Sequence, residues 1–262
     1  MSPKSKVQSP KSETKNPHSI SIRNPKSEIR ILLWDIDGTM LIAPRSGNYK
    51  EYFAKSLSRV YGSHGTIWEM GSVSGMTDLQ IAFEALKPEN VTLETIYELK
   101  DDFHKVFTEE MMKVCDANHF RILDGVREIL QATRENPIFV NALLTGNLEN
   151  AAKLKLKIVG LEEFFDFELG AFGDSSHQRQ DLPQIAADKI SARFDYNFAP
   201  SQFIILGDTP NDIACARYFG AKAVAVATGR SHPPETLSPH NPDFLFENLS
   251  DTAKVIDVLS KL

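Results

Sequence analysis

Short apolar runs of strand length alternate with stretches of helical periodicity from residue 29 onward. Four runs are almost continuously apolar, as expected for strands of an α/β sheet whose two faces are both covered. These runs span residues 31–34, 138–144, 203–206 and 223–227, and weaker candidates span 167–169 and 244–246. The pattern predicts a mostly parallel sheet whose successive strands are joined by helices.

Helical periodicity fills the intervals between these strands in the second half of the chain. The predicted helices span 124–135, 147–159, 181–194, 211–219 and 250–261. Asp124, Asn147 and Asn211 stand at plausible N-cap positions. Asp181 is followed three residues later by Gln184, as in a capping box. The alternation of strand and helix predicts an α/β fold.

An all-helical insertion interrupts this alternation after the first strand. Residues 46–120 contain no convincing strand but three helical patterns, at 47–61, 77–86 and 92–115. An insertion at this place would overhang the carboxyl ends of the strands, where open α/β sheets bind ligands. We therefore expect a helical cap at 46–120 above a core formed by 29–45 and 121–262.

The first 28 residues differ in composition from the rest of the chain. They hold seven Ser, five Lys and four Pro and no Phe, Trp or Tyr. Such a segment cannot bury enough surface to offset its ordering entropy, so we expect a disordered tail. An organelle transit peptide and an arm that binds an anionic surface stay open as alternatives to a tail without a role.

The composition of the 262-residue chain excludes several classes of protein. No stretch approaches the ~20 apolar residues of a membrane-spanning helix. Two cysteines, Cys115 and Cys215, provide neither a disulfide framework nor zinc-ligand spacing. The net charge of -6 argues against a general nucleic-acid binder. We expect a cytoplasmic protein with no nucleic-acid or membrane partner.

Polar clusters follow three of the predicted strands at the point where each strand ends. Asp35 and Asp37 follow the first strand, Thr145 the second, and Asp208 and Asp212 the third. Carboxylates that converge at one edge repel each other unless a cation is bound, and carboxylate oxygens without His or thiolate ligands favour Mg²⁺. Mg²⁺ usually pairs with phosphate, which predicts a phosphorylated substrate. One Asp can attack phosphorus while a neighbouring Asp protonates the leaving oxygen and activates water.

These clusters resemble motifs of the haloacid dehalogenase superfamily in sequence, order and separation. The matching stretches are Asp35-Ile36-Asp37-Gly38-Thr39, Leu144-Thr145-Gly146-Asn147 and Gly207-Asp208-Thr209-Pro210-Asn211-Asp212. The segment 145–156, the later Phe172-Gly173-Asp174 and the helical insertion make the chain most similar to the phosphoglycolate-phosphatase-like branch. The resemblance covers residues 29–262 and implies a Rossmann-like, mostly parallel sheet core with a mobile helical cap.

Carried over to this sequence, the resemblance implies a role for each matching residue. Asp35 would be the nucleophile, Asp37 the general acid and base, and Thr145 a hydrogen-bond donor to the phosphoryl group. Mg²⁺ would be held by the side chains of Asp35 and Asp208 and the backbone carbonyl of Asp37. Asp212 would orient these ligands. The residues expected to surround the phosphoryl group are Gly38, Thr39, Gly146 and Asn147.

The third motif of the family requires a cation that screens the charges of nucleophile and phosphate. Arg179, just before a predicted helix, is the candidate, and Lys155 is the alternative. In the insertion, the segment 71–78 resembles the Gly-rich specificity loop of helical caps, although Thr77 or Asp78 would serve equally as an N-cap.

Polar residues outside the motifs carry weaker expectations. Arg45 and Asn48 could reach a substrate from the hinge of the insertion. Four histidines show no partner pattern and are expected at the surface or in packing: His64, His104, His119 and His177.

Together these features predict a magnesium-dependent phosphatase that hydrolyses a small phosphomonoester through an aspartyl-phosphate. The resemblance alone implies that this ester is phosphoglycolate-like. Asp37 would supply the proton that an alkoxide leaving group needs, and a helical cap can close over a small ester and exclude water. Two alternatives stay open: a phosphomutase of the β-phosphoglucomutase type on the same core, and a non-catalytic binding protein with the same fold. The sequence leaves the oligomeric state open.

Overall fold

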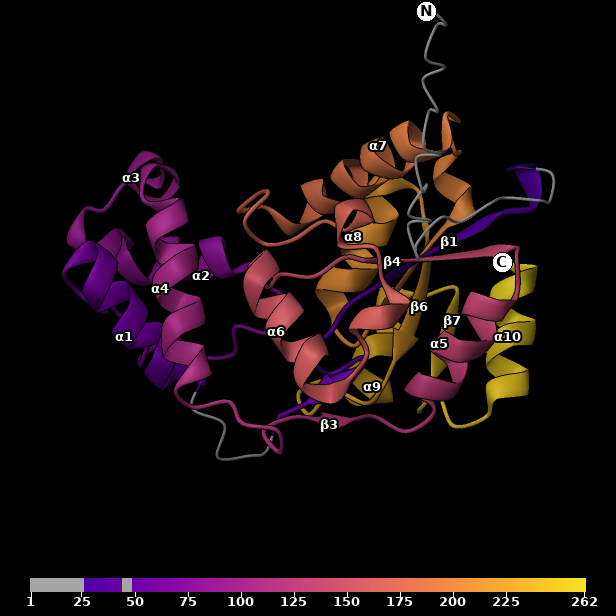
Figure 1. Cartoon of the computed structure of the whole chain (residues 1–262), viewed down its shortest axis with the longest axis horizontal. Helices are drawn as coiled ribbons and strands as arrows, with labels where there is room; N and C mark the ends of the chain where they lie inside the picture. The colour runs from indigo at the N-terminus through magenta and orange to yellow at the C-terminus, as the bar shows by residue number, and fades with distance from the viewer. Residues whose placement is uncertain (1–25, 44–48) are drawn as a thin grey trace, which may run out of the picture.

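Five parallel strands form the central sheet of the computed structural model, which describes residues 26–43 and 49–262 (Figure 1). The strand order is β4-β1-β5-β6-β7, and each neighbouring pair is parallel. The strands are β1 Arg30–Trp34, β4 Phe139–Leu143, β5 Phe203–Gly207, β6 Lys222–Val226 and β7 Phe244–Phe246. The predicted α/β fold with a Rossmann-like core is confirmed.

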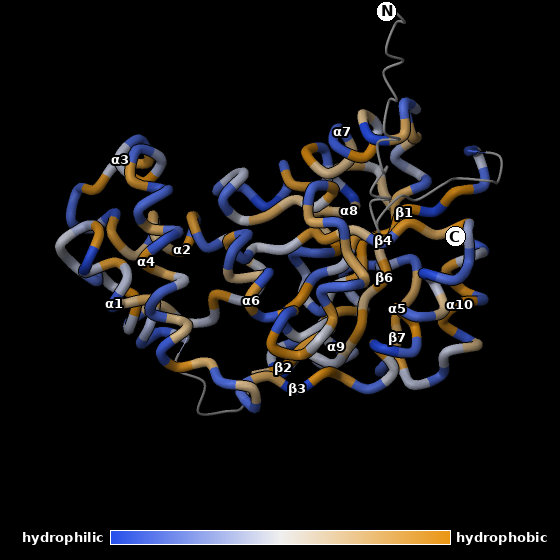
Figure 2. The backbone as a smooth tube through the Cα atoms, in the orientation of Figure 1, coloured by the Kyte–Doolittle hydropathy of each residue, from blue (hydrophilic) through white to orange (hydrophobic). Residues whose placement is uncertain are grey.

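Helices cover both faces of this sheet. On one face, Leu32 and Trp34 of β1 pack in a cluster with α5 (Val126–Glu135), α6 (Glu149–Val159) and α10 (Thr252–Lys261). On the other, Ile31 and Leu33 pack with α7 (Leu182–Phe194) and α8 (Pro210–Phe219). Successive side chains of a strand point to opposite faces, so a strand buried on both sides is apolar along most of its length (Figure 2); the buried Asn141 of β4 is an exception.

Four helices between β1 and β4 form a separate group at one end of the molecule (Figure 1). They are α1 Tyr49–Tyr61, α2 Asp78–Leu86, α3 Leu93–Glu98 and α4 Lys100–Met112. Their apolar faces meet in a cluster around Phe53, Phe103 and Phe107, which Leu148 and Ala151 join from the start of α6. At its base the group is flanked by two short antiparallel strands, β2 (Leu41–Ile42) and β3 (Arg121–Ile122).

Two predicted elements differ from the observed ones. Residues 167–169 form a 3-10 helix rather than a strand, because Asp166 accepts a hydrogen bond from the backbone of Glu168 and begins a turn. The pattern at 92–115 is not one helix: it is interrupted at Leu99 between α3 and α4, and α4 ends at Met112. Neither Gly nor Pro marks the break at Leu99, so the periodicity alone could not reveal it.

Three predicted N-caps were wrong, because other residues occupy the cap positions. Gly125 rather than Asp124 precedes α5, and its φ of +82° gives it a left-handed conformation. Leu148 rather than Asn147 precedes α6. Thr209 rather than Asn211 caps α8, in a capping box with Asp212.

The fourth predicted cap is correct in position only. Asp181 stands at the N-cap of α7 but makes no capping hydrogen bond to it. Its carboxylate accepts instead from the Ser176 hydroxyl at 2.7 Å.

The N-terminal segment is described only at its end. Residues 1–25 of the predicted tail, and Arg45 and Asn48, lie outside the described residues, whereas Lys26–Glu28 form a short 3-10 helix. The C-terminal region adds a short helix, α9 (Pro234–Leu237), between β6 and β7. Within the described ranges, no helix is both long and apolar enough to cross a membrane.

Two glycines with the same backbone conformation provide a test of the packing between α5 and the chain before α10. A Cβ at Gly125 would lie 1.8 Å from the carbonyl oxygen of Leu249, whereas one at Gly62, with φ of +83°, would meet nothing within 4 Å. We expect Gly62→Ala to cost about 1–2 kcal/mol, because only the left-handed conformation is strained. Gly125→Ala should cost about 2–5 kcal/mol, since the backbone must also shift. Equal losses in urea unfolding would contradict this packing.

Candidate active site

Three loops that follow β1, β4 and β5 meet beside a cavity of about 240 Å³. Because β4 and β5 flank β1 on either side, their carboxyl ends bring the three sequence clusters to one edge of the sheet. Asp35, Asp37 and Thr145 line the cavity from the core, together with Arg179. The opposite wall comes from the helical group and its loops: Tyr49, Tyr52, Val73, Met76, Asp78 and Ile81.

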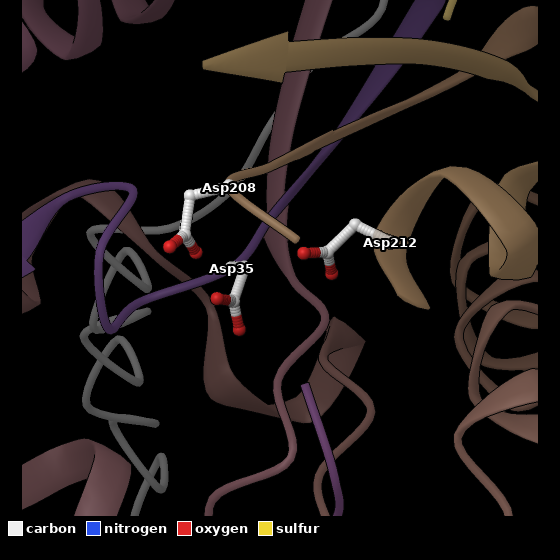
Figure 3. Close-up of side chains that lie close together, drawn as sticks. All are labelled: Asp35, Asp208 and Asp212. Carbon is white, nitrogen blue, oxygen red and sulfur yellow. The ribbon is translucent and has the colours of Figure 1, made fainter. Parts of the chain in front are cut away.

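A compact cluster of carboxylates lies at the core side of this edge. Oxygens of Asp35, Asp208 and Asp212 all lie within 4.8 Å of one another, and Figure 3 shows the three side chains grouped together. All three residues are at least nine-tenths buried. Burial, followed by repulsion from Asp35 and Asp212, raises the pKa of Asp208 to about 9. Burial also raises the pKa of Asp35 to about 7, although Arg179 opposes the shift.

Two glycines leave room for the backbone to approach Asp208 closely. A Cβ at Gly38 would lie 2.2 Å from Oδ2 of Asp208, and one at Gly229 only 1.7 Å away. Thr39 donates a hydrogen bond of 3.4 Å to Oδ1 of the same carboxylate. The N–H of Gly38 donates to the carbonyl of Leu41, so in this conformation it is not available to a phosphoryl group.

The donor set of this cluster fits Mg²⁺. Both oxygens of Asp212 have protein partners: Oδ2 accepts from the Thr209 backbone N–H and hydroxyl, and Oδ1 accepts from Arg179. Asp35 and Asp208 keep oxygens that can bind a cation, and the ligands are all hard oxygens. A divalent cation would also offset the repulsion that raises the pKa of Asp208.

Two buried basic side chains, Arg179 and Lys155, pair with different carboxylates. Arg179, in a 3-10 helix before α7, places Nη2 3.1 Å from Oδ1 of Asp35 and also pairs with Asp212. Lys155, on α6, places Nζ 2.5 Å from Oδ2 of Asp37 and 2.6 Å from Oδ1 of Asn147. Arg179 is therefore the cation beside the expected nucleophile, and Lys155 lies beside the expected general acid.

Asn147 joins the loops of the first two motifs. Its amide nitrogen donates to Oδ2 of Asp37 and to Oγ1 of Thr145, both at 2.7 Å. The hydroxyl of Thr145 also accepts from the N–H of Asn147 at 3.3 Å. Since Thr145 lines the cavity and accepts these two bonds, its own hydroxyl hydrogen can be donated to a ligand.

Asp78, the last residue of the segment that resembles a specificity loop, connects the helical group to the second motif. Its N–H donates to the carbonyl of Gly146 at 2.7 Å, and its Oδ2 accepts from the N–H of Leu148 at 2.9 Å. Its Oδ1 accepts from the Tyr49 hydroxyl at 3.1 Å. Burial raises the pKa of Asp78 to about 6, although Lys155 opposes this shift. Thr77 caps α2 by accepting from the N–H of Gln80.

Two histidines expected at the surface or in packing also join the helical group to the core. His177 Nδ1 lies 3.0 Å from the hydroxyl of Tyr97 in α3. His104, in α4, accepts at Nε2 from the N–H of Asn150 at 3.0 Å. No spacing in the sequence could have shown these pairs, because the partners lie 46 and 80 residues apart.

Comparisons with known proteins identify the family. The family model of haloacid dehalogenase-like hydrolases matches residues 32–217, and a second model of similar hydrolases matches 183–252. The chain is 25% identical over 238 residues to a pyrophosphatase PpaX of Anoxybacillus flavithermus, covering 89% of this chain and 99% of that protein. It is 24% identical over 236 residues to a phosphoglycolate phosphatase of Vibrio vulnificus, covering 89% and 97% respectively.

A solved structure has the same fold. It is a HAD hydrolase of family IA, variant 3, from Entamoeba histolytica, with a TM-score of 0.63, 19% identity, and coverage of 89% of this chain and 100% of that chain. The resemblance of the motifs and the expectation of an enzyme are thus confirmed: the chain belongs to the haloacid dehalogenase-like hydrolase family.

Proposed function

We propose that this hydrolase is a Mg²⁺-dependent phosphatase that acts on a small phosphorylated metabolite through an aspartyl-phosphate. The observation that carries the proposal is the meeting of the Asp35, Asp208 and Asp212 cluster with Arg179 and Asp37 beside one cavity. Bound to Asp35, Asp208 and the carbonyl of Asp37, Mg²⁺ would neutralise charge on the nucleophile and the phosphoryl group.

The first step forms a covalent intermediate on Asp35. An oxygen of its carboxylate attacks phosphorus, and the bond from phosphorus to the ester oxygen breaks. Asp37 gives its proton to that leaving oxygen, which departs as an alcohol. The guanidinium of Arg179 and the hydroxyl of Thr145 donate hydrogen bonds to the transferring phosphoryl oxygens, where negative charge is concentrated.

The second step regenerates the enzyme. Asp37, now a carboxylate, takes a proton from a water molecule as the water oxygen attacks phosphorus. The bond between phosphorus and Asp35 breaks, and inorganic phosphate leaves. Asp212 forms no bond to substrate in this scheme, because both its oxygens hold Thr209 and Arg179 in place.

The dimensions of the cavity support a small substrate. About 240 Å³ is below the ~300–1,000 Å³ typical of pockets for drug-sized ligands. We assign residues 46–120 as a cap over a core of 29–45 and 121–262, because residues such as Val73 and Met76 form the wall opposite Asp35. A phosphoglycolate-like ester fits this space, and the names of the two curated relatives suggest phosphoglycolate and pyrophosphate as first candidates.

Phosphate release from a substrate panel tests this proposal. The panel holds 2-phosphoglycolate, pyrophosphate, sugar phosphates and nucleoside monophosphates, each assayed with Mg²⁺ and with EDTA. We expect Mg²⁺-dependent release, fastest for the smallest substrates, because the cavity restricts the leaving group. Transfer of phosphate between positions of a sugar, without release, would favour the phosphomutase. No reaction of the folded protein with any member would favour a non-catalytic binding protein.

A further inference from the structure

Lys155 is an unusual residue to find on the apolar face of α6. The buried positions of this helix are Ala151, Ala152, Lys155 and Leu156, which recur at helical spacing. The side chain of Lys155 is only 4% exposed. Lysine is rarely buried to this degree unless its charge is paired, so its partners indicate why it is there.

Both hydrogen bonds of the ammonium group lead to Asp37. Nζ donates to Oδ2 of Asp37 at 2.5 Å and to Oδ1 of Asn147 at 2.6 Å. Asn147 in turn donates from Nδ2 to the same Oδ2 of Asp37. On its third side, Nζ lies 5.8 Å from the centroid of the Phe120 ring, within the range of a cation–π contact.

The two hydrogen bonds leave the oxygens of Asp37 in different environments. Oδ2 is held by both Lys155 and Asn147, whereas Oδ1 accepts no hydrogen bond from any residue of 26–43 or 49–262. The side chain of Asp37 is 45% exposed and lines the cavity. Because Oδ2 is held by the protein, Oδ1 is the oxygen that remains available to a substrate.

We propose that Lys155 is a positioning residue: it anchors Oδ2 of Asp37 so that Oδ1 alone faces the leaving oxygen and exchanges the proton. This inference rests on the proposed function. When the bond from phosphorus to the ester oxygen breaks, the proton on Oδ1 passes to that oxygen, and Oδ1 later accepts a proton from the attacking water. Arg179, which contacts Asp35, remains the cation at the phosphoryl group.

Leaving-group dependence distinguishes this role from phosphate binding. We compare Lys155→Met with the wild type on an alkyl phosphate, whose leaving group needs a proton, and on p-nitrophenyl phosphate, whose leaving group does not. For the alkyl ester, kcat should fall about 100-fold or more, the cost of misplacing a general acid, while KM stays within about threefold. The first turnover of p-nitrophenyl phosphate should slow less than about threefold, visible as a burst of nitrophenolate before slow hydrolysis of the intermediate.

Three further variants serve as controls. Arg179→Met should slow both esters in the first turnover, because Arg179 acts on the phosphoryl group. Lys157→Met removes an exposed lysine from the same helix and should leave both rates unchanged. Asp37→Asn should slow the alkyl ester far more than p-nitrophenyl phosphate, as Lys155→Met does. The double variant should be no slower than Asp37→Asn alone, because both changes impair the same proton transfer.

The possible results separate the inference from the proposed function. If Lys155→Met slows both esters alike, or if its effect multiplies with that of Asp37→Asn, Lys155 does not act through Asp37 and the inference is overturned. In both cases the phosphatase activity itself still stands. A wild-type protein inactive on every ester would overturn the proposed function and the inference with it. Circular dichroism of each variant identifies any loss that comes from unfolding.

Discussion

Asp35→Asn is expected to lower kcat by about 10⁴-fold or more, the largest single effect on activity in this protein. The amide keeps the shape of the side chain but cannot attack phosphorus. Because burial already disfavours the charged carboxylate of Asp35, as its raised pKa shows, the variant should fold as stably as the wild type. Steady-state phosphate release and thermal unfolding, measured on the same preparation, test both parts of this expectation.

Trapping the aspartyl-phosphate tests directly whether Asp35 is the nucleophile. Rapid acid quenching of the wild type during turnover, followed by borohydride reduction, should convert residue 35 to homoserine, which peptide mass spectrometry detects. Asp257→Asn is the matched control, because Asp257 lies exposed on α10 and, within residues 26–43 and 49–262, forms an ion pair only with Lys261. Modification at another residue, or turnover by Asp35→Asn at more than a few per cent of the wild-type rate, would remove Asp35 as the nucleophile.

The sheet and the three motif clusters could be predicted because their signals are local. Strands buried on both faces are almost continuously apolar, and the clusters at their ends converge because β4, β1 and β5 are neighbours in the sheet. The N-cap predicted at Asn147 failed for the opposite reason. Asn147 is a good capping residue by type, but its side chain is engaged by Thr145, Lys155 and Asp37, and Asp37 lies 110 residues away in the chain.

The contacts between the helical group and the core also could not be predicted from a sequence pattern. Asp78 is a plausible first-turn acid of α2, and nothing local shows that it also accepts from Leu148, 70 residues later. The sequence did contain a local signal for Lys155, because its position falls on the same helix face as the buried Ala151 and Ala152. That register predicts burial but not the partner, because the partner depends on how α6 lies against the loop after β1.

Asp208→Asn should make the metal-free protein more stable while it abolishes the response to Mg²⁺. Burial, followed by repulsion from the neighbouring Asp35 and Asp212, raises the pKa of Asp208 to about 9. Replacing one of these carboxylates by a neutral amide should stabilise the metal-free fold at pH 8 by about 1–3 kcal/mol. Thermal unfolding in EDTA measures this gain, and phosphate release should fall at least 10³-fold because the cation is lost.

The wild type should respond to Mg²⁺ in proportion to occupancy of the site. At about 100 times the dissociation constant, binding to the folded state alone contributes about 2.7 kcal/mol. For a chain of this length that is a rise in Tm of roughly 5–10 °C. Asp208→Asn should show little of this rise, and a variant that keeps the full rise would exclude Asp208 as a ligand.

The difference in stability between the metal-free wild type and Asp208→Asn should depend on pH. An acid whose pKa is higher in the folded than in the unfolded state contributes stability that is complete below the unfolded value, 3.8 for Asp208, and is lost as pH rises through the folded value of about 9. Metal-free wild type should therefore lose stability relative to Asp208→Asn between pH 6 and pH 9. Over the same range the stabilisation by Mg²⁺ should grow, because fewer protons compete for the carboxylates. A difference between the two proteins that stays constant from pH 6 to pH 9 would mean that Asp208 is already ionised at pH 6, and that the three carboxylates do not need a cation to coexist.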